Sequence, residues 1–303
     1  MSIVTGGGRG IGRAVALALA ESGHPVCVND TGVGLDGYRP DPVPAQRVAE
    51  EIRAAGGQAL ALAIDGRTRP EAEALIGAVQ DWMGVTPSVL VHAAGTLRDG
   101  MVHKASDEDW SEVLGSHLGV AVELTRALAG PIRREGNGRI VYLGGAAGLV
   151  GSVGQAAYAV AKAGLFGLTR AVALEMAGRD VCVNYVAPFA FTRMTESIPP
   201  ATEQLRRYLE AAPAGRPHDV APLVAWLCSP AAAGVSGQIF GARGAEVTVW
   251  SQPRPAARFV DPQGWNAESL TSLRTRLAPE LVPLESEFDL FGGPPVPIGG
   301  APE

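Results

Sequence analysis

The sequence predicts an α/β protein built on a doubly wound parallel sheet. Residues 2–5 read as a short buried strand, residues 11–20 as an apolar-faced helix, and a glycine-rich turn lies between them. A second strand over residues 25–30 ends on Asp30. Strand, glycine turn, helix, strand and acid make up the mononucleotide-binding half of such a sheet. With 303 residues, of which 47% are hydrophobic, the chain can fill one large core, and we expect one domain with appendages.

The turn reads Gly6-Gly7-Gly8-Arg9-Gly10-Ile11-Gly12. Its glycines permit positive φ angles and let a ligand approach the backbone without a Cβ in the way. The following helix points its unpaired N–H groups and its positive dipole end at the same place, so backbone donors would hold a pyrophosphate there. We therefore assign dinucleotide binding to this turn. The alternative is a flexible loop that only joins two elements.

Two acids at strand ends are candidate contacts to the adenosine half of the dinucleotide. Asp30 would accept hydrogen bonds from the ribose hydroxyls and repel a 2'-phosphate, which favours NAD over NADP. Arg9 would favour a phosphate and points mildly the other way. Asp65, followed by Gly66 at the end of a third strand, is placed to bind the adenine amine. For both acids the alternative is a helix or turn cap.

The remaining elements alternate as the fold requires. Small residues in His92-Ala93-Ala94-Gly95 follow the fourth strand and leave room for a cofactor across its end. Further strands are expected at residues 58–64, 88–91, 138–143, 181–186 and 236–240, and further helices at residues 45–56, 70–83, 107–128, 155–175, 220–228 and 267–277.

Tyr158 and Lys162 form the chemical centre that we predict. A spacing of four places both side chains on one face of the helix at residues 155–175. A nearby ammonium favours the phenolate, so the tyrosine pKa is expected to fall from about 10 toward working pH. Such a tyrosine can exchange a proton with a substrate oxygen while a nicotinamide exchanges hydride with the attached carbon. The alternative is a surface tyrosine and lysine without a joint role.

Composition excludes several other classes of function. The formal net charge is −6 and no run of lysine or arginine occurs, so a nucleic-acid partner is not expected. Cys27, Cys182 and Cys228 lack metal-ligand spacing, so no metal site is expected, and they suggest a reducing compartment. We find no signal peptide and no apolar run of membrane-spanning length, and expect a soluble, cytoplasmic protein without a membrane partner.

Together, Thr5-Gly6-x-x-x-Gly10-x-Gly12, Asp65, Ala93-Ala94-Gly95 and Tyr158-x-x-x-Lys162 resemble the short-chain dehydrogenase/reductase family over about residues 2–245. Within it, stretches such as His117-Leu118 and those around Asp30 and Tyr158 look like the (3R)-hydroxyacyl-CoA dehydrogenase module of multifunctional β-oxidation enzymes. The resemblance implies a Rossmann-type sheet of about seven strands, NAD, a secondary alcohol or ketone substrate, and a homodimer or homotetramer. It also implies that Tyr158 is the acid/base and that Lys162 holds the nicotinamide ribose.

Several positions depart from the family pattern. The usual serine thirteen residues before the tyrosine is Gly145, so one hydrogen-bond donor to the substrate oxygen is missing. Ser152, Tyr142 and His117 are candidate replacements. His117 stands where most members have the asparagine of a proton relay, as in the hydroxyacyl-CoA subgroup. His92 and Ala93 replace an asparagine pair, and we expect the side chain that ties the neighbouring helix to be absent.

The resemblance also assigns residues near position 190 to the nicotinamide and the substrate. Pro188 matches the turn that contacts the carboxamide, with Phe189 where glycine is usual, and Thr192 resembles a hydroxyl contact on the carboxamide or pyrophosphate. Residues 190–216 resemble the substrate lid, whose arginines (Arg193, Arg206 and Arg207) could meet a CoA phosphate but are more often solvated. We place the dehydrogenase domain at 1–245 and a partly irregular extension at 246–303.

These features predict an NAD(P)-dependent oxidoreductase that interconverts a secondary alcohol and a ketone. The substrate would be a hydrophobic small molecule such as an acyl thioester, a polyketide or a steroid-like compound, because Phe189, Phe191, Met194 and Val150 suggest an apolar pocket mouth. Gly145 keeps an alternative open: a non-redox activity (cyclisation, isomerisation or dehydration), or a nucleotide-binding role with impaired redox chemistry. The extension is expected to lie across a neighbouring subunit or to border the substrate pocket.

Overall fold

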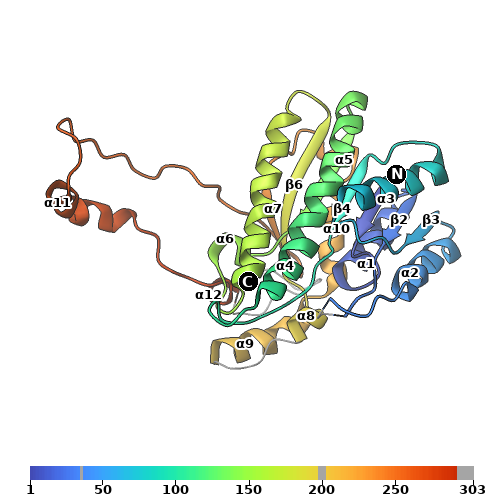
Figure 1. The fold of residues 1–303 in the computed structure, drawn as a ribbon, viewed down its shortest axis with the longest axis horizontal. Coiled ribbons are helices and arrows are strands. Elements are labelled where there is room, and N and C mark those ends of the chain that lie inside the picture. The colour runs from blue at the N-terminus through green and yellow to red at the C-terminus, as the bar shows by residue number, and fades with distance from the viewer. Residues whose placement is uncertain (35–36, 197–202, 292–303) are drawn as a thin grey trace.

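A computed structural model describes residues 1–34, 37–196 and 203–291 (Figure 1). Within them, eight strands form one sheet in the order β3-β2-β1-β4-β5-β6-β7-β8. All pairs from β3 to β7 are parallel, and β8 pairs antiparallel with β7. The predicted doubly wound α/β fold is confirmed, with eight strands where about seven were expected.

The strands occupy the predicted places with ends shifted by a few residues. They are β1 (Ser2–Thr5), β2 (Val26–Asn29), β3 (Ala59–Leu62), β4 (Val89–His92), β5 (Gly138–Leu143), β6 (Val181–Pro188), β7 (Ile239–Arg243) and β8 (Glu246–Val249). The strand β8 was not predicted as a strand, and it means that the C-terminal extension begins inside the sheet.

The helices that cover the sheet also match the predicted pattern. They are α1 (Gly10–Glu21), α2 (Val43–Ala54), α3 (Arg69–Met83), α4 (Asp107–Leu114), α5 (Val120–Glu135), α7 (Ala156–Glu175) and α10 (Pro217–Leu227). Shorter helices are α6 (Ala147–Val150), α8 (Arg193–Glu196), α9 (Glu203–Ala211) and α12 (Glu287–Phe291), and α11 (Ala267–Leu277) has the predicted bounds.

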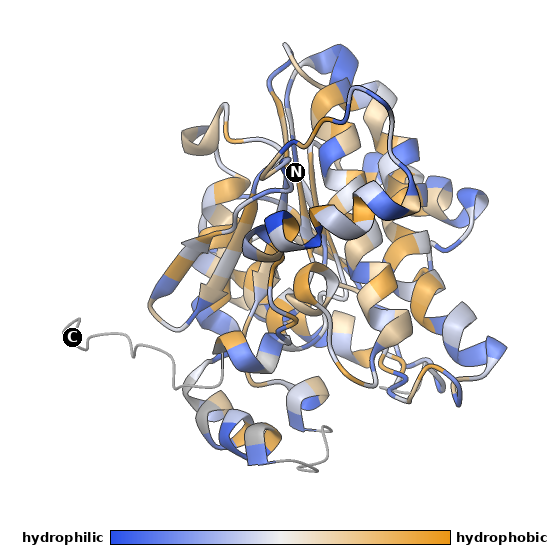
Figure 2. Cartoon of the chain, turned by 90° about the vertical axis from the view of Figure 1, so that its left-hand side faces the viewer, coloured by the Kyte–Doolittle hydropathy of each residue, from blue (hydrophilic) through white to orange (hydrophobic). Residues whose placement is uncertain are grey.

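Alternation along each strand builds two cores, one on each face of the sheet. Val4 and its neighbours Val28 and Val91 point to the layer of α1, α2 and α10. Ile3 and its neighbours point to the layer of α3, α5 and α7. Figure 2 shows hydrophobic residues along the strands, with polar residues at helix ends and loops. Because both faces are buried, the carboxyl ends of the strands become the place where a site can open.

The long helix predicted over residues 107–128 is interrupted. It consists of α4, a π-helical turn at Gly115–Gly119, and α5. Glycine favours the helix poorly, and the Ser116 hydroxyl donates to the Val113 carbonyl at 3.3 Å, so this segment departs easily from regular α geometry. The turn presents His117 to the carboxyl end of β4.

One helix has the length and hydropathy that would let it cross a membrane, among the residues that the structure describes: α7. It packs against β6, α4 and α6, and its buried residues Leu165 and Val172 belong to the core on that face of the sheet. Its apolar composition is therefore explained by its place in the helix layer.

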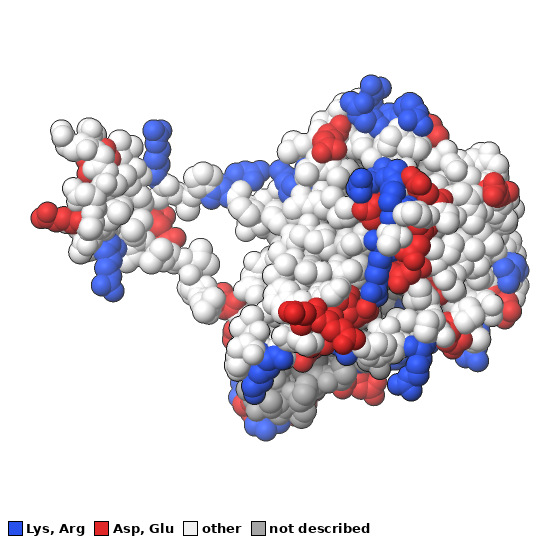
Figure 3. Space-filling model, viewed as in Figure 1, with Lys and Arg blue, Asp and Glu red and all other residues white. Residues whose placement is uncertain are grey.

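The C-terminal extension leaves the sheet after β8 and returns at α12. Figure 1 shows α11 standing away from the body of the molecule, while α12 lies beside α6 and α9. Figure 3 shows acidic and basic side chains interspersed on the same face. The irregular end predicted for the chain, residues 292–303, lies outside the described residues.

Candidate active site

One cavity at the carboxyl ends of the strands collects nearly all the predicted site residues. It is lined by Gly6, Arg9, Gly10, Ile11, Gly12, Asp30, Asp65, Ala93, Ala94, Gly95, His117, Tyr158, Lys162, Pro188 and Thr192. Gly66 is not among the lining residues. The cavity lies where β1 and β4 are adjacent and the chain leaves the sheet in opposite directions, which is the binding crevice of doubly wound sheets.

The glycine turn is packed so closely that side chains are excluded. A Cβ on Gly12 would lie 2.1 Å from the Gly6 carbonyl oxygen, and one on Gly6 would lie 2.7 Å from the Ala94 nitrogen. Gly6 also has a φ of 64°. Glycine at these positions lets the start of α1 approach β1 and β4, so backbone N–H groups face the cavity.

Asp30 ties this turn to the loop after β2. Its two carboxylate oxygens accept from the Gly8 N–H at 2.8 Å and from the Gly32 N–H at 2.7 Å. Arg9 turns away from Asp30 and donates to the carbonyls of Gly32 and Val33 at 3.2 and 3.1 Å. The turn-capping role that the sequence left open is therefore real, and it places a carboxylate in the cavity wall at the same time.

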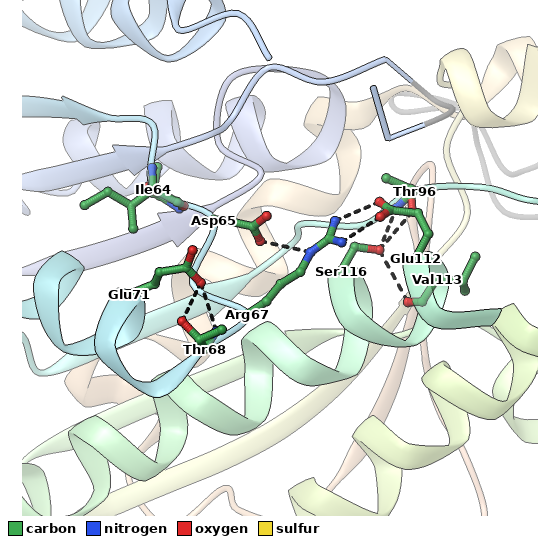
Figure 4. A network of polar contacts seen from close by, with 10 residues as sticks. Ile64, Asp65, Arg67, Thr68, Glu71, Thr96, Glu112, Val113 and Ser116 are labelled. Carbon is green, nitrogen blue, oxygen red and sulfur yellow. Dashed lines mark hydrogen bonds and ion pairs between the residues drawn. The ribbon is translucent and has the colours of Figure 1, made fainter. Parts of the chain in front are cut away.

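Asp65 takes part in an ion-pair network that the sequence did not predict (Figure 4). Arg67 donates to both oxygens of Glu112 at 2.6 and 2.7 Å and forms an ion pair with Asp65 at 2.9 Å. Burial raises the pKa of Asp65, and Arg67 opposes that rise. The cap of α3 is Thr68 with Glu71, so Asp65 is free of that role. Arg67 itself lines the cavity.

The π-turn is fastened to the loop after β4 by hydroxyl groups, also seen in Figure 4. The Ser116 and Thr96 hydroxyls lie 2.9 Å apart, and the Thr96 N–H donates to Ser116 Oγ at 3.3 Å. Both residues line the cavity and were missed from the sequence. A serine and a threonine separated by twenty residues carry no motif that would have revealed them.

His92 supplies the tie that was expected to be absent. Its Nε2–H donates to the carbonyl of His117 at 2.7 Å, and its Nδ1 accepts from the Thr5 hydroxyl at 2.8 Å. Acceptance at Nδ1 requires the neutral ring, because a protonated Nδ1 cannot accept, and burial lowers the pKa of His92 to about 3. The expectation was wrong because it weighed only the loss of asparagine, whereas an imidazole at the same place joins β1, β4 and the π-turn.

His117 is held against the floor of the site. Its ring occupies the position of the missing Gly95 side chain, where a Cβ would lie 1.8 Å from Cε1. Nε2–H donates to the Thr96 carbonyl at 2.8 Å, and Nδ1 has no hydrogen-bond partner within the described residues. Burial, aided by Lys162, lowers the pKa of His117 well below its usual range. The neutral ring therefore offers an acceptor, and its edge meets the Tyr158 ring at 5.1 Å.

Tyr158 and Lys162 share one face of α7, as predicted. Lys162 Nζ lies 5.3 Å from the centroid of the Tyr158 ring and donates to the Leu143 carbonyl at 2.7 Å. Burial lowers the pKa of Lys162 to about 7. Burial also raises the pKa of Tyr158 well above its ordinary value, and the charge of Glu287 is the next largest cause of that rise. The predicted lowering is thus not seen in the chain alone, because burial of the hydroxyl is the largest effect on its pKa.

Gly145 faces the Tyr158 hydroxyl with no side chain of its own. A Cβ there would lie 3.1 Å from Tyr158 Oη. The backbone is fixed from behind by Tyr185, whose hydroxyl donates to the Gly145 carbonyl at 2.8 Å and accepts from its N–H at 2.9 Å. Tyr142 and Ser152 were two of the suggested replacements for the missing serine. The Tyr142 hydroxyl is buried and hydrogen-bonds the Thr125 hydroxyl at 2.6 Å. Ser152 Oγ is buried and has no hydrogen-bond partner in the described part of the chain.

The start of the predicted lid closes the cavity beside the glycine turn. Thr192 and Met194 line it, and a Cβ on Gly10 would lie 3.7 Å from Thr192 Cγ2. Phe189, Phe191 and Val150 are not among the lining residues, so the apolar mouth is smaller than predicted. Arg206 and Arg207 pair with Glu203 on the surface of α9. Residues 197–202 of the lid lie outside the described residues.

The site fits a dinucleotide in shape and donor set. The glycine positions are ones that a Cβ would fill, Asp30 stands where ribose hydroxyls would be expected, and the free Nδ1 of His117 borders Tyr158 and Lys162. Backbone donors at the pyrophosphate, an acceptor at the ribose and a tyrosine at the reacting carbon therefore open on one cavity.

Comparisons with known proteins agree with this geometry. The family model described as enoyl-(acyl carrier protein) reductase matches residues 6–244. The hydroxyacyl-CoA dehydrogenase ChsB1 of Mycobacterium tuberculosis is 38% identical over 290 residues, which is 90% of this chain and 86% of that one. The mouse peroxisomal multifunctional enzyme type 2 is 39% identical over 226 residues, 75% of this chain but 29% of that enzyme.

A solved structure extends the likeness to the fold. The crystal structure of a short chain dehydrogenase from Mycobacterium avium superposes with a TM-score of 0.79 at 35% identity, covering 94% of this chain and 96% of that one. The resemblance stated from the sequence motifs is confirmed.

Proposed function

The chain belongs to the short-chain dehydrogenase/reductase family of oxidoreductases, and from this premise we propose that it interconverts a secondary alcohol and a ketone on an acyl thioester. The observation that carries the proposal is that Tyr158 and Lys162 line the same cavity as the glycine turn. A proton donor thus opens on the place where a nicotinamide would lie.

The chain's own residues divide the work as follows. A bound nicotinamide dinucleotide supplies or takes up hydride. Tyr158 exchanges the proton on the substrate oxygen, and its raised pKa keeps the phenol protonated, ready to donate to a ketone. Lys162, which donates to the Leu143 carbonyl, would hold the nicotinamide ribose. The unpaired Nδ1 of His117 would accept a hydrogen bond from a bound group next to Lys162.

The thioester class rests on the relatives. The family model is described by an acyl carrier protein substrate, and the Mycobacterium tuberculosis relative is named for a hydroxyacyl-CoA. The latter aligns over 90% of this chain, which is more than the dehydrogenase domain alone, so the alignment includes part of the C-terminal extension. A thioester with a hydrophobic acyl chain would pass Met194 at the cavity wall.

Asp30 supports NAD over NADP as the coenzyme. Its carboxylate lines the cavity and would face a 2'-phosphate with like charge. Two cations, Arg9 and Arg193, also line the cavity near Asp30. Burial lowers the pKa of Arg193, and repulsion by Arg9 lowers it further. The choice is testable by measuring kcat/KM with each coenzyme.

A homodimer or homotetramer and a cytoplasmic location stay predictions. Sedimentation of the whole chain and of a chain ending at Gly244 would measure the assembly and the contribution of the extension to it. If both assemblies contain the same number of subunits, the extension has no role in assembly.

The activity is tested by following NADH absorbance with 3-oxoacyl and 3-hydroxyacyl thioesters of CoA and of pantetheine. We expect turnover in the native protein and a loss of at least about a hundredfold in kcat in Tyr158→Phe, with dinucleotide binding retained. Full turnover in Tyr158→Phe would refute the mechanism. Gly145 favours the second candidate, a non-redox activity: dinucleotide binding without turnover on any ketone or alcohol would support it.

A further inference from the structure

Gly145 supplies no side-chain donor beside the Tyr158 hydroxyl. A side chain at this position would face the Tyr158 hydroxyl, since its Cβ would lie 3.1 Å away. The Tyr185 hydroxyl is already hydrogen-bonded to the Gly145 N–H and carbonyl, and the Tyr142 hydroxyl to the Thr125 hydroxyl. The Ser152 hydroxyl interacts with the Glu287 carboxyl, so that carboxyl is the next group that could supply a second donor to a substrate oxygen.

The C-terminal extension returns to the segment between Gly145 and Tyr158. After α11, which stands away from the body, the chain returns so that α12 contacts α9 beside α6 (Figure 1). The backbone N–H of Glu287 donates to the Gly151 carbonyl at 3.3 Å, which fixes the first residue of α12 next to the loop that leads into α7. Tyr158 lies in the first turn of α7.

Glu287 is the charged residue that acts most on Tyr158. Its charge is the first cause after burial that raises the pKa of Tyr158, ahead of Tyr185, Tyr208 and Asp99. It also raises the pKa of Tyr185 behind Gly145 and of Tyr208 on the lid helix α9. Together with the backbone bond to Gly151 and the interaction with the Ala147 backbone, these effects place the carboxyl group near Tyr158.

The surroundings of Glu287 favour a protonated acid. Burial raises the pKa of Glu287 to about 7, and the charge of Asp99 adds to the rise. Interactions with the Ser152 hydroxyl and the Ala147 backbone act in the opposite direction. A carboxylic acid kept neutral near pH 7 can donate a hydrogen bond, as a serine hydroxyl does.

We propose that Glu287, brought by α12, donates the hydrogen bond to the substrate oxygen that the missing side chain at Gly145 cannot supply. The inference rests on the proposed redox function. In ketone reduction the carbon accepts a hydride, the carbonyl π electrons move to oxygen, and that oxygen takes the proton of Tyr158 to give the alcohol and the phenolate. Glu287 keeps its proton and stabilises the developing charge.

Four variants test the role by activity. Glu287→Ala should lower kcat about a hundredfold or more, as loss of one oxyanion donor does, while dinucleotide affinity is unchanged. Adding Gly145→Ser to Glu287→Ala should restore at least about tenfold of that loss. Glu287→Gln, which keeps a donor, should stay within about tenfold of the native kcat and lose the decline above about pH 7. Glu285→Ala, exposed in the same segment, is the matched control and should match the native protein.

A native kcat in Glu287→Ala, or a double variant no faster than Glu287→Ala, overturns the proposal. A pH profile unchanged in Glu287→Gln does the same, because Asp99, Tyr185, Tyr208 and the nearby Arg243 would then govern the decline.

A readout without turnover keeps this test separate from the proposed function. Ultraviolet titration of the tyrosines in the dinucleotide-free chain should show a lower pKa for Tyr158 in Glu287→Gln than in the native protein, with Tyr158→Phe identifying the transition. If the native protein has no redox turnover but this shift occurs, the proposed function fails and the placement of Glu287 stands. An identical Tyr158 transition in both proteins overturns the placement.

Discussion

Replacing His92 with asparagine should remove a large part of the acid sensitivity of this fold. The His92 ring is fully buried, and acceptance of the Thr5 hydroxyl bond at Nδ1 needs the neutral form. Burial, with help from Lys162, lowers its pKa from 6.5 to about 3. Protonation is therefore far easier in the unfolded chain than in the folded one.

The sign and size follow from proton linkage. Because the folded pKa is depressed, the stability contribution is present above pH 6.5 and is lost as pH falls toward about 3. In that window the unfolded chain binds one more proton, which costs about 1.4 kcal/mol per pH unit. Lowering the pH from about 8 to about 5 should thus remove about 2 kcal/mol through His92 alone.

Urea unfolding followed by circular dichroism, at one protein concentration and at both pH values, measures this effect. His117 is buried as well, and burial and Lys162 act on its pKa more strongly than His92 does, so the larger part of its own titration is common to the native and His92→Asn chains. We expect the native protein to lose about 2 kcal/mol more than the variant on acidification. Equal losses in the two proteins would show that the ring does not titrate as the structure requires.

Three further predictions concern the cavity wall. Gly12→Ala should weaken dinucleotide binding at least about tenfold in fluorescence titrations, since its Cβ would lie 2.1 Å from the Gly6 oxygen. Gly77→Ala, which meets nothing within 4 Å, should not. Tyr185→Phe should cost about 2 kcal/mol in urea unfolding, because it leaves the buried Gly145 N–H unpaired and leaves the Gly145 carbonyl with the Gly148 N–H, 3.1 Å away, in place of two donors; an unchanged midpoint would contradict those bonds. Asp30→Ser should shift the kcat/KM ratio of NADP to NAD upward at least about tenfold, and a constant ratio would remove Asp30 from coenzyme choice.

Local patterns predicted most of the fold because each depends on neighbours in the chain. The β1 strand, the glycine turn and α1 are written in consecutive residues, and the bounds of α11 followed from helical periodicity alone. The helix over residues 107–128 was predicted without its π-turn, since that break is held by tertiary contacts. The bond from His92 to His117 spans 25 residues, and no periodicity records it.

The same limit explains which site residues were missed. Arg67 and Glu112 are 45 residues apart, so neither carried a sign of the other. The motif comparison singled out Gly145 and His117, but it treated Gly145 and the replacement of an asparagine by His92 as losses. Glu287 lies in a helix of five residues behind an irregular stretch, where the sequence offers no periodic pattern that would place it beside Tyr158.

Tyr185 shows why these departures must be judged together. A Cβ on Gly144 would lie 1.8 Å from Cζ of the Tyr185 ring, so a side chain at this position and the buried tyrosine exclude one another. A Cβ on Gly145 meets only the Tyr158 side chain, 3.1 Å from its hydroxyl, and a small shift of that ring relieves the contact. A serine can therefore return at Gly145 while Tyr185 stays, but not at Gly144. That asymmetry makes Gly145→Ser a fair rescue of Glu287→Ala, because the single change restores a hydroxyl without disturbing the tyrosine that holds the backbone beneath it.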